Sequence, residues 1–320
     1  MKNQQYKVQM KKIYVTIAFA LMILGSVNAQ QDPQYTQYMY NMNVVNPAYA
    51  GSKEALSIGL LYRSQWVNIN EAPKTATLSI HSPIGKNVGL GFSVISDRIG
   101  PVEENNVFAD FSYTLNLGGE HRLAFGLKAG ATIQNIGLFS DIGNGFVPDP
   151  SDEAFSENTS NTYLNIGSGV FYYTDKYYVS LSVPNMLKST YLDVTNNGQQ
   201  FEYGSEVLHY FLSAGYVFNL STNTKFKPSF LMKSAFNAPT SLDVSANFLF
   251  FDKFEIGATY RLDDALGAMA NIVISNGIRI GYAYDYVTSD LNIRTSGSHE
   301  LMLLFDLNFS KKVSISPRFF

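Results

Sequence analysis

From Leu56 to the last residues of the chain, apolar residues alternate with polar or small residues along most segments. The segment 110–117 reads DFSYTLNL, and the segment 254–261 reads FEIGATYR. The same alternation runs through residues 122–129, 279–286 and 300–309. A period of two places successive side chains on opposite faces of a β-strand, so each of these segments predicts a strand with two different faces.

The two faces of the predicted strands differ in a way that distinguishes a barrel from a sandwich. One face is uncharged and rich in Tyr and Phe, as expected where strands cross a membrane interface. The other face mixes both signs of charge with Gly, Ser and Asn, which is typical of a narrow polar barrel interior. Its ionisable residues are Arg63, His81, Asp97, Asp110, Lys128, Lys225, Lys227, Lys233, Asp243, Arg261, Arg279 and Asp285.

The number and length of the strands fit the same fold. Most segments are close to the roughly nine to eleven residues that a tilted membrane strand needs, and their number is even. The sequence therefore predicts an all-β protein, a transmembrane antiparallel outer-membrane β-barrel of about 14 strands. The predicted strands are 56–66, 74–82, 87–97, 106–117, 122–136, 163–174, 177–184, 206–220, 225–235, 240–250, 254–262, 265–275, 278–287 and 299–309.

The gaps between these strands predict the orientation of the barrel. The gaps after even-numbered strands are short, namely 83–86, 118–121, 175–176, 221–224, 251–253 and 276–277. Several gaps after odd-numbered strands are long, namely 67–73, 98–105, 137–161, 185–205 and 288–298. Outer-membrane barrels have short periplasmic turns and longer extracellular loops, so we expect both termini in the periplasm.

The N-terminal region predicts export. Basic residues precede the apolar run 13–27, which ends in Val27-Asn28-Ala29, the pattern of a cleaved secretory signal peptide. The run is too short to span a bilayer as a helix. The expected organisation is a signal peptide at 1–29, a periplasmic N-terminal segment at 30–54 and the barrel at 55–320.

Composition agrees with a membrane location and excludes several function classes. Charged residues make up 15% of the chain, below the roughly 25% of soluble domains, whereas aromatic residues reach 14%. The absence of Cys excludes disulfides, thiolate nucleophiles and lipoprotein anchoring. A net charge of −3 does not indicate a basic surface for nucleic acid. Because the predicted barrel lies in a membrane, the expected non-protein partner is membrane lipid.

Candidate chemistry is sparse. The four histidines, His81, His121, His209 and His299, have no metal-ligand spacing, and no nucleophile or phosphate-loop motif occurs. We therefore expect no enzyme activity, no cofactor and no metal centre. One loop leaves a question open, because the acidic stretch 140–161 offers oxygen ligands for Ca²⁺ without the spacing of a calcium loop, and a solvated acidic loop is the simpler interpretation. Its candidate ligands are Asp141, Asn144, Asp149, Asp152, Glu153 and Glu157.

The segment 35–50, which precedes the first predicted strand, does not have the pattern of a membrane strand. Asn41, Asn43 and Asn46 interrupt the alternation, and Pro47 removes a ladder donor. Two arrangements are open. The segment folds into the barrel mouth, with its tyrosines packed against lumen residues, or it offers a periplasmic partner a flat aromatic patch.

Several motifs resemble one family. Residues 31–39 read QDPQYTQYM, residues 46–51 read NPAYAG, and residues 62–66 read YRSQW. Together with GLGFS at 89–93, DRIG at 97–100 and the ending SPRFF at 316–320, they resemble the PorP/SprF family of Bacteroidota type IX secretion proteins. Where many relatives have Asn-Pro before this block, the chain has Asn41-Met42. The N-terminal family motif comprises Gln37, Tyr38, Asn46, Pro47, Ala48, Tyr49 and Gly51.

The resemblance implies an outer-membrane barrel with one of two roles. Some members capture the C-terminal domain of a secreted adhesin and assist its export and attachment to the cell surface, as in gliding motility. Others belong to the core secretion machine and contact its periplasmic lipoprotein ring. A porin-like solute channel is the third hypothesis, although Phe171 and Phe211 are predicted to crowd the interior. If the barrel captures a secreted protein, the long loops 137–161 and 185–205 are its expected binding surface, with anchors at Phe146, Phe155, Tyr191, Phe201 and Tyr203.

Overall fold

The structure is a computed structural model that describes residues 33–53, 55–137, 159–187, 190–196, 199–205, 208–235, 239–275 and 277–307. Three short helices, η1 (Tyr38–Tyr40), α2 (Met42–Val45) and η2 (Pro47–Tyr49), precede the strands. The strands are β1 (Leu56–Ser64), β2 (Lys74–Pro83), β3 (Val88–Ile99), β4 (Val102–Gly118), β5 (His121–Ile136), β6 (Thr159–Tyr173), β7 (Tyr177–Val183), β8 (Thr190–Asn196), β9 (Gln199–Ser205), β10 (His209–Tyr216), β11 (Phe218–Ser221), β12 (Thr224–Ala235), β13 (Ser241–Phe250), β14 (Phe254–Arg261), β15 (Ala265–Ser275), β16 (Ile278–Val287) and β17 (Ser298–Leu307).

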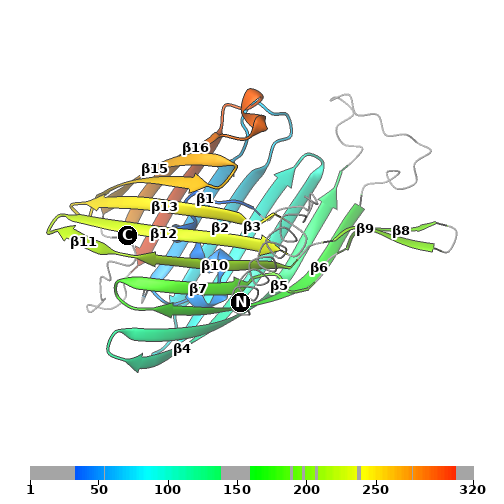
Figure 1. Cartoon of the computed structure of the whole chain (residues 1–320). Coiled ribbons are helices and arrows are strands. Elements are labelled where there is room, and N and C mark those ends of the chain that lie inside the picture. The colour runs from blue at the N-terminus through cyan, green and yellow to red at the C-terminus, as the bar shows by residue number, and fades with distance from the viewer. Residues whose placement is uncertain are drawn as a thin grey trace, which may run out of the picture.

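The strands form a closed antiparallel barrel (Figure 1). The strands from β1 to β7 and from β11 to β17 each pair with the next strand in sequence, and β7 pairs with β10. The first strand, β1, pairs with the last, β17, from Leu56↔Leu307 to Ser64↔His299. β10 and β11 both pair with β12 and together occupy one position in the wall. The barrel therefore has fourteen strand positions, which confirms the predicted fold and strand number.

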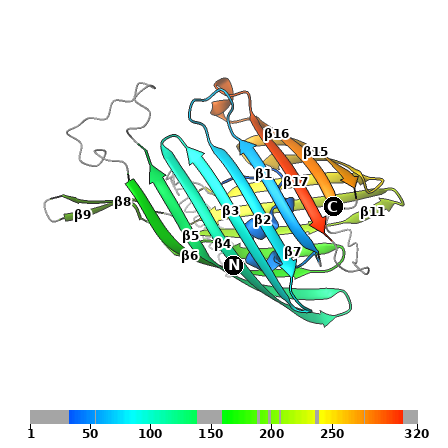
Figure 2. The same ribbon diagram turned by 180° about the vertical axis from the view of Figure 1, so that it is seen from behind.

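The two ends of the barrel differ. At one end, called the turn end, short connections join β2 to β3, β4 to β5, β6 to β7, β11 to β12, β13 to β14 and β15 to β16. β1 begins and β17 ends at this turn end. The opposite end, called the loop end, carries the connections 65–73 and 288–297, with the helix η5 (Asp290–Ile293) in the second (Figure 2). This alternation of short and long connections agrees with the predicted gaps.

The distribution of side chains is inverted relative to a soluble protein. Leu127 and Leu164 expose 64% and 74% of their area on the outer face, whereas Arg63 and Glu300 on the inner face expose 1% and 0%. Apolar side chains outside and paired charges inside fit a barrel surrounded by lipid. The predicted inward positions of Phe171 and Phe211 are confirmed by their burial. No helix among the described residues is long and apolar enough to span a bilayer.

Two predicted connections are wrong in detail. Residues 98–105 were expected as a loop, but β3 continues to Ile99 and β4 begins at Val102, so only Gly100 and Pro101 form the turn. Gly100 has φ +56°, which suits glycine in a tight hairpin. The connection 185–205, also expected as a loop, contains the separate two-stranded sheet β8–β9.

Candidate functional site: the plugged lumen and its loop end

The residues before the first strand lie inside the barrel. We call residues 33–53 the plug. Pro33 lies near the loop end, beside Trp66 and Pro239, whereas Gly51 lies against Pro83 and Gly89 at the turn end. The plug therefore runs through the lumen from the loop end to the turn end before the chain enters the wall. Of the two arrangements left open by the sequence, the one in which the segment packs against lumen residues is found.

The family motif explains the local fold of the plug. The Asn46 side chain caps the helix η2 by accepting a 2.9 Å hydrogen bond from the Ala48 N–H. Pro47 stands at the first helical position, where its missing N–H costs no hydrogen bond. The Asn46 amide nitrogen also donates to the Val170 carbonyl at 3.1 Å and to the Ser180 hydroxyl at 2.8 Å. One side chain thus shapes the plug and attaches it to β6 and β7.

The part of the plug nearest the loop end is held by buried charges. The Glu300 carboxylate on β17 accepts hydrogen bonds from the backbone N–H groups of Thr36 at 2.9 Å and Gln37 at 2.8 Å. The Arg63 guanidinium on β1 pairs with Glu300 at 3.2 Å and with Asp285 at 2.8 Å. The Thr36 hydroxyl donates to Asp285 at 2.6 Å and accepts from Arg63 at 2.9 Å. Backbone and side-chain groups of the plug therefore complete a charge network in the wall.

A second network holds the part nearer the turn end. The Tyr40 hydroxyl donates to the Glu255 carboxylate, which pairs with Arg279 at 2.7 Å. Arg279 also donates to the Tyr40 oxygen at 2.6 Å. Farther along, Lys53 pairs with Asp306 at 3.2 Å.

Glycines on the inner wall make room for the plug. A Cβ added at Gly126 of β5 would lie 2.1 Å from the Ala48 nitrogen, and one at Gly89 of β3 would lie 2.2 Å from the Ala50 carbonyl oxygen. At Gly169 of β6 a Cβ would lie 2.0 Å from the Asn46 side-chain oxygen. Any larger residue at these positions would have to displace the plug or the wall. The lumen is thus fitted to this segment.

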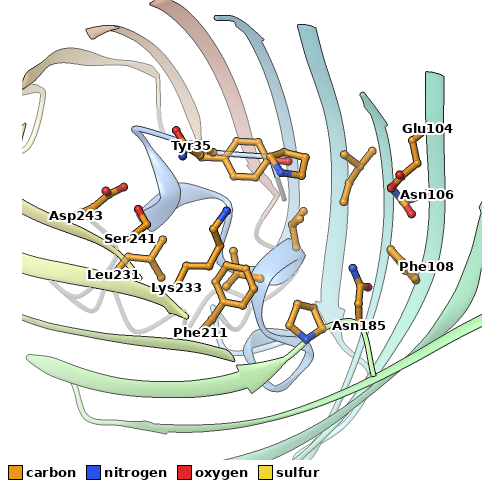
Figure 3. Close-up of a pocket in the computed structure, with 16 residues that line it drawn as sticks. Tyr35, Glu104, Asn106, Phe108, Asn185, Phe211, Leu231, Lys233, Ser241 and Asp243 are labelled. Atoms are coloured by element: carbon orange, nitrogen blue, oxygen red, sulfur yellow. The ribbon is translucent and has the colours of Figure 1, made fainter. Parts of the chain in front are cut away.

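Two hollows lie beside the start of the plug at the loop end. The apolar hollow, a cavity of about 70 Å³, is lined chiefly by Val44, Val45, Ile95, Phe108, Phe211 and Leu231. In Figure 3, Phe211, Leu231 and Lys233 approach it from one side, and Glu104, Asn106 and Phe108 lie on the other. The acidic hollow, of about 550 Å³, is lined by residues that include Trp66, Asp97, Arg261, Asp263 and Asp264. Pro33 and Gln34 line both hollows, which are therefore adjacent.

The residues predicted from the sequence fall into three groups. Gln37, Tyr38, Asn46, Pro47, Ala48 and Tyr49 of the family motif are buried in the plug, and Gly51 ends it. Tyr191 lies in β8, and Phe201 and Tyr203 lie in β9. Phe146 and Phe155, like the signal peptide and the candidate calcium ligands Asp141–Glu157, lie outside the described residues. The five aromatic residues remain predicted anchors. Glu300 and Glu255, the central carboxylates of the two networks, were missed, although their places on the inner face were visible in the alternation.

The described part of the chain gives no group of three metal-ligating side chains. What it contains instead is a membrane barrel closed by its own N-terminal segment, with the family motif inside. A family model described as type IX secretion system membrane protein PorP/SprF matches residues 27–305. The chain belongs to this PorP/SprF family. Family and fold together place it in the outer membrane as a barrel of the type IX secretion system.

Comparison with known proteins adds the architecture alone. A search of curated proteins gave no match to this PorP/SprF protein. Among solved structures, the Ralstonia pickettii toluene transporter TbuX is similar, with 10% identity and a TM-score of 0.49 over 84% of this chain and 93% of that chain. The Acinetobacter baumannii outer-membrane protein Omp33 has 11% identity and a TM-score of 0.48, covering 80% of this chain and 100% of that chain. At this level of similarity, the toluene transport of TbuX says nothing about the present protein.

Proposed function

We propose that this PorP/SprF barrel is a non-enzymatic binding protein. It captures the C-terminal domain of a secreted, adhesin-like partner at the loop end, assists the export of that partner and attaches it to the cell surface. The observation that carries the proposal is the plug. A lumen filled by the chain's own N-terminal segment and crossed by buried ion pairs suits a binding protein, whereas a solute channel needs an open path.

The loop end offers the larger surface for such a partner. β8 and β9 form a hairpin that extends beyond the barrel wall, as both views of the fold show. In its register Leu192 pairs with Tyr203 and Val194 with Phe201, while Asp193 pairs with Glu202. Two apolar pairs thus flank one pair of acidic residues in the hairpin. A specific interface needs roughly 800 Å² from each partner, which the two-residue turn at Gly100 and Pro101 cannot supply.

The alternative role, docking on the periplasmic lipoprotein ring through the N-terminal motif, has less support. Tyr38, Asn46 and Ala48 each expose 0% of their area, because they face the lumen wall. A ring protein could not reach these side chains unless the plug left the barrel. We therefore retain ring docking only as the outcome that a negative capture experiment would favour.

The test removes the hairpin without touching a barrel strand. Residues 190–205 are replaced by a short Gly-Ser linker, and a matched variant carries the same linker in place of residues 119–120 at the turn end. We expect the hairpin variant to assemble in the outer membrane at the wild-type level and to lose co-purification of the partner's C-terminal domain. The turn-end variant should retain capture. If capture survives removal of both the hairpin and residues 138–158, these loops are not the capture surface and ring docking gains support.

A further inference from the structure

The two hollows at the loop end are adjacent, and we call them together the recess; residues of the plug line both. Tyr35, Val44 and Val45, all in the plug, contribute to the apolar hollow. The Tyr35 hydroxyl is bonded to Thr77 of the wall at 3.2 Å, which helps to fix this boundary. A molecule that enters the recess from the loop end therefore meets the plug. Such a geometry suits docking and does not suit transport.

The size of the apolar hollow limits what it can hold. Its volume of about 70 Å³ is several times the roughly 10–15 Å³ that one water molecule needs. It is far too small for a folded domain. Ile95, Phe108, Phe211 and Leu231 make much of its lining apolar, which favours an apolar guest over water. The charged residues Glu104, Lys233 and Asp243 also line it. One aliphatic side chain is the guest that fits both size and polarity.

The charge of the adjacent acidic hollow determines which residue can lie beside the aliphatic side chain in the bound peptide. The charged residues in its lining are three carboxylates, Asp97, Asp263 and Asp264, and one guanidinium, Arg261, so the lining has a net charge of −2. Arg261 bonds both oxygens of Asp243 at 2.9 and 3.1 Å and pairs with Asp264 at 3.6 Å, so its single charge is shared among several carboxylates. Asp263 is exposed to solvent. The hollow thus has an excess of negative charge facing the loop end.

Trp66 adds a second attraction for a cation. It lines the acidic hollow and is half-buried, and its backbone has φ +46°, an uncommon conformation for a residue with a side chain. Indole rings attract ammonium and guanidinium groups that lie over their faces. Carboxylates and an indole around one cavity therefore favour Lys or Arg over a neutral or acidic residue.

We propose that the recess binds a peptide segment of the secreted partner that carries an aliphatic side chain beside an Arg or Lys. The aliphatic side chain enters the apolar hollow, and the cation lies among Asp97, Asp263 and Asp264. This proposal rests on the proposed function, because it assigns the segment to the captured partner. It differs from the hairpin surface, since it uses the mouth of the lumen itself.

The single Trp of the chain makes the test direct, because Trp66 fluorescence reports on the acidic hollow alone. The full-length protein in detergent is titrated with three blocked peptides of sequence Ser-Leu-Arg-Ser, Ser-Gly-Arg-Ser and Ser-Leu-Glu-Ser. We expect a saturable change with the first, binding at least about tenfold weaker with the second, and no binding with the third. The affinity of the first peptide should fall with added salt. No saturable change with the first peptide, or equal affinity for all three, would overturn the proposal.

Variants locate the binding. Leu231→Phe reduces the apolar hollow, and Asp263→Asn removes the exposed carboxylate, while Glu120→Gln removes an exposed carboxylate at the turn end as the matched control. Binding of the Leu-Arg peptide should weaken in the first two variants and remain unchanged in the third. Capture of the partner's C-terminal domain is measured with the same proteins. If capture is intact in wild type and in all three variants, the recess proposal fails while the proposed function stands; if wild type captures nothing, the function itself fails.

Discussion

The backbone N–H of Thr36 in the plug donates a 2.9 Å hydrogen bond to the carboxylate of Glu300 in the last strand of the wall. Glu300 exposes 0% of its area and also pairs with Arg63. Replacement by Ala would leave a buried guanidinium and two buried N–H groups without this acceptor. We expect Glu300→Ala to lower the free energy of unfolding by about 3–5 kcal/mol, as measured by folding titrations in lipid vesicles. The exposed Glu120→Ala is the control, and equal effects of the two changes would contradict the assigned network.

The plug predicts a closed barrel. In a planar bilayer the intact protein should pass little current, and deletion of residues 31–50 should open it. Gly126→Leu should have a similar effect, because its Cβ would lie 2.1 Å from the Ala48 nitrogen. Gly85→Leu is the matched control, since a Cβ there meets no atom within 4 Å. Large, steady unitary conductance of the wild type would instead support the solute-channel hypothesis.

We expect that no other residue can replace Asn46 without loss of stability. Its amide oxygen accepts from Ala48, and its nitrogen donates to Val170 and Ser180. Asn46→Asp retains the acceptor but loses the donor and buries a charge, whereas Asn46→Ala loses both roles. We expect each change to cost at least about 1–3 kcal/mol in vesicle folding titrations, with current appearing as the plug loosens. A silent Asn46→Asp would show that the Val170 and Ser180 contacts do not hold the plug.

We expect a charged side chain on the outer face to destabilise the barrel most near the middle of the bilayer. Leu127 lies mid-strand in β5 and is 64% exposed, so Leu127→Arg should destabilise the barrel by roughly 2–4 kcal/mol. On the inner face, Ala283→Ser is expected to be nearly neutral, because it adds one small uncharged group that does not face lipid. The readout is again the folding midpoint in vesicles. Equal effects at these two positions would mean that the faces are assigned wrongly.

The barrel could be predicted from the sequence because alternation is a local property. In β5, for example, Phe125 and Leu127 face outward while Ala124 and Lys128 are buried, as the period of two requires. The turn at Gly100 and Pro101 could not be found in the same way. Arg98 pairs with Glu103 and Asp97 with Glu104 in strands that continue past the apolar band, and such polar positions look like loop in the sequence. The β8–β9 hairpin had a signal that was not used, the Asn197-Gly198 pair between two short alternating stretches.

The position of the plug depends on contacts that no local pattern contains. The alternation showed that residues 35–50 do not form a strand, but their partners, such as Glu255 and Glu300, lie more than two hundred residues away in sequence. The inner-face glycines Gly89, Gly126 and Gly169 were the available clue, because a barrel with an empty lumen has no need of them. A non-strand segment at the N-terminus together with such glycines indicates that the segment lies inside the lumen.

The network at Glu300 also bears on the order in which this protein folds. β1 and β17 are the first and last strands, so the seam between them closes the longest loop in the chain and is the slowest pairing to search for. Arg63 and Glu300 stand on the two sides of that seam and complete their hydrogen bonds with Thr36 and Gln37. A barrel that sealed before the plug was in place would bury these charges with fewer partners. We therefore expect the N-terminal segment to be in place before the seam between β1 and β17 closes.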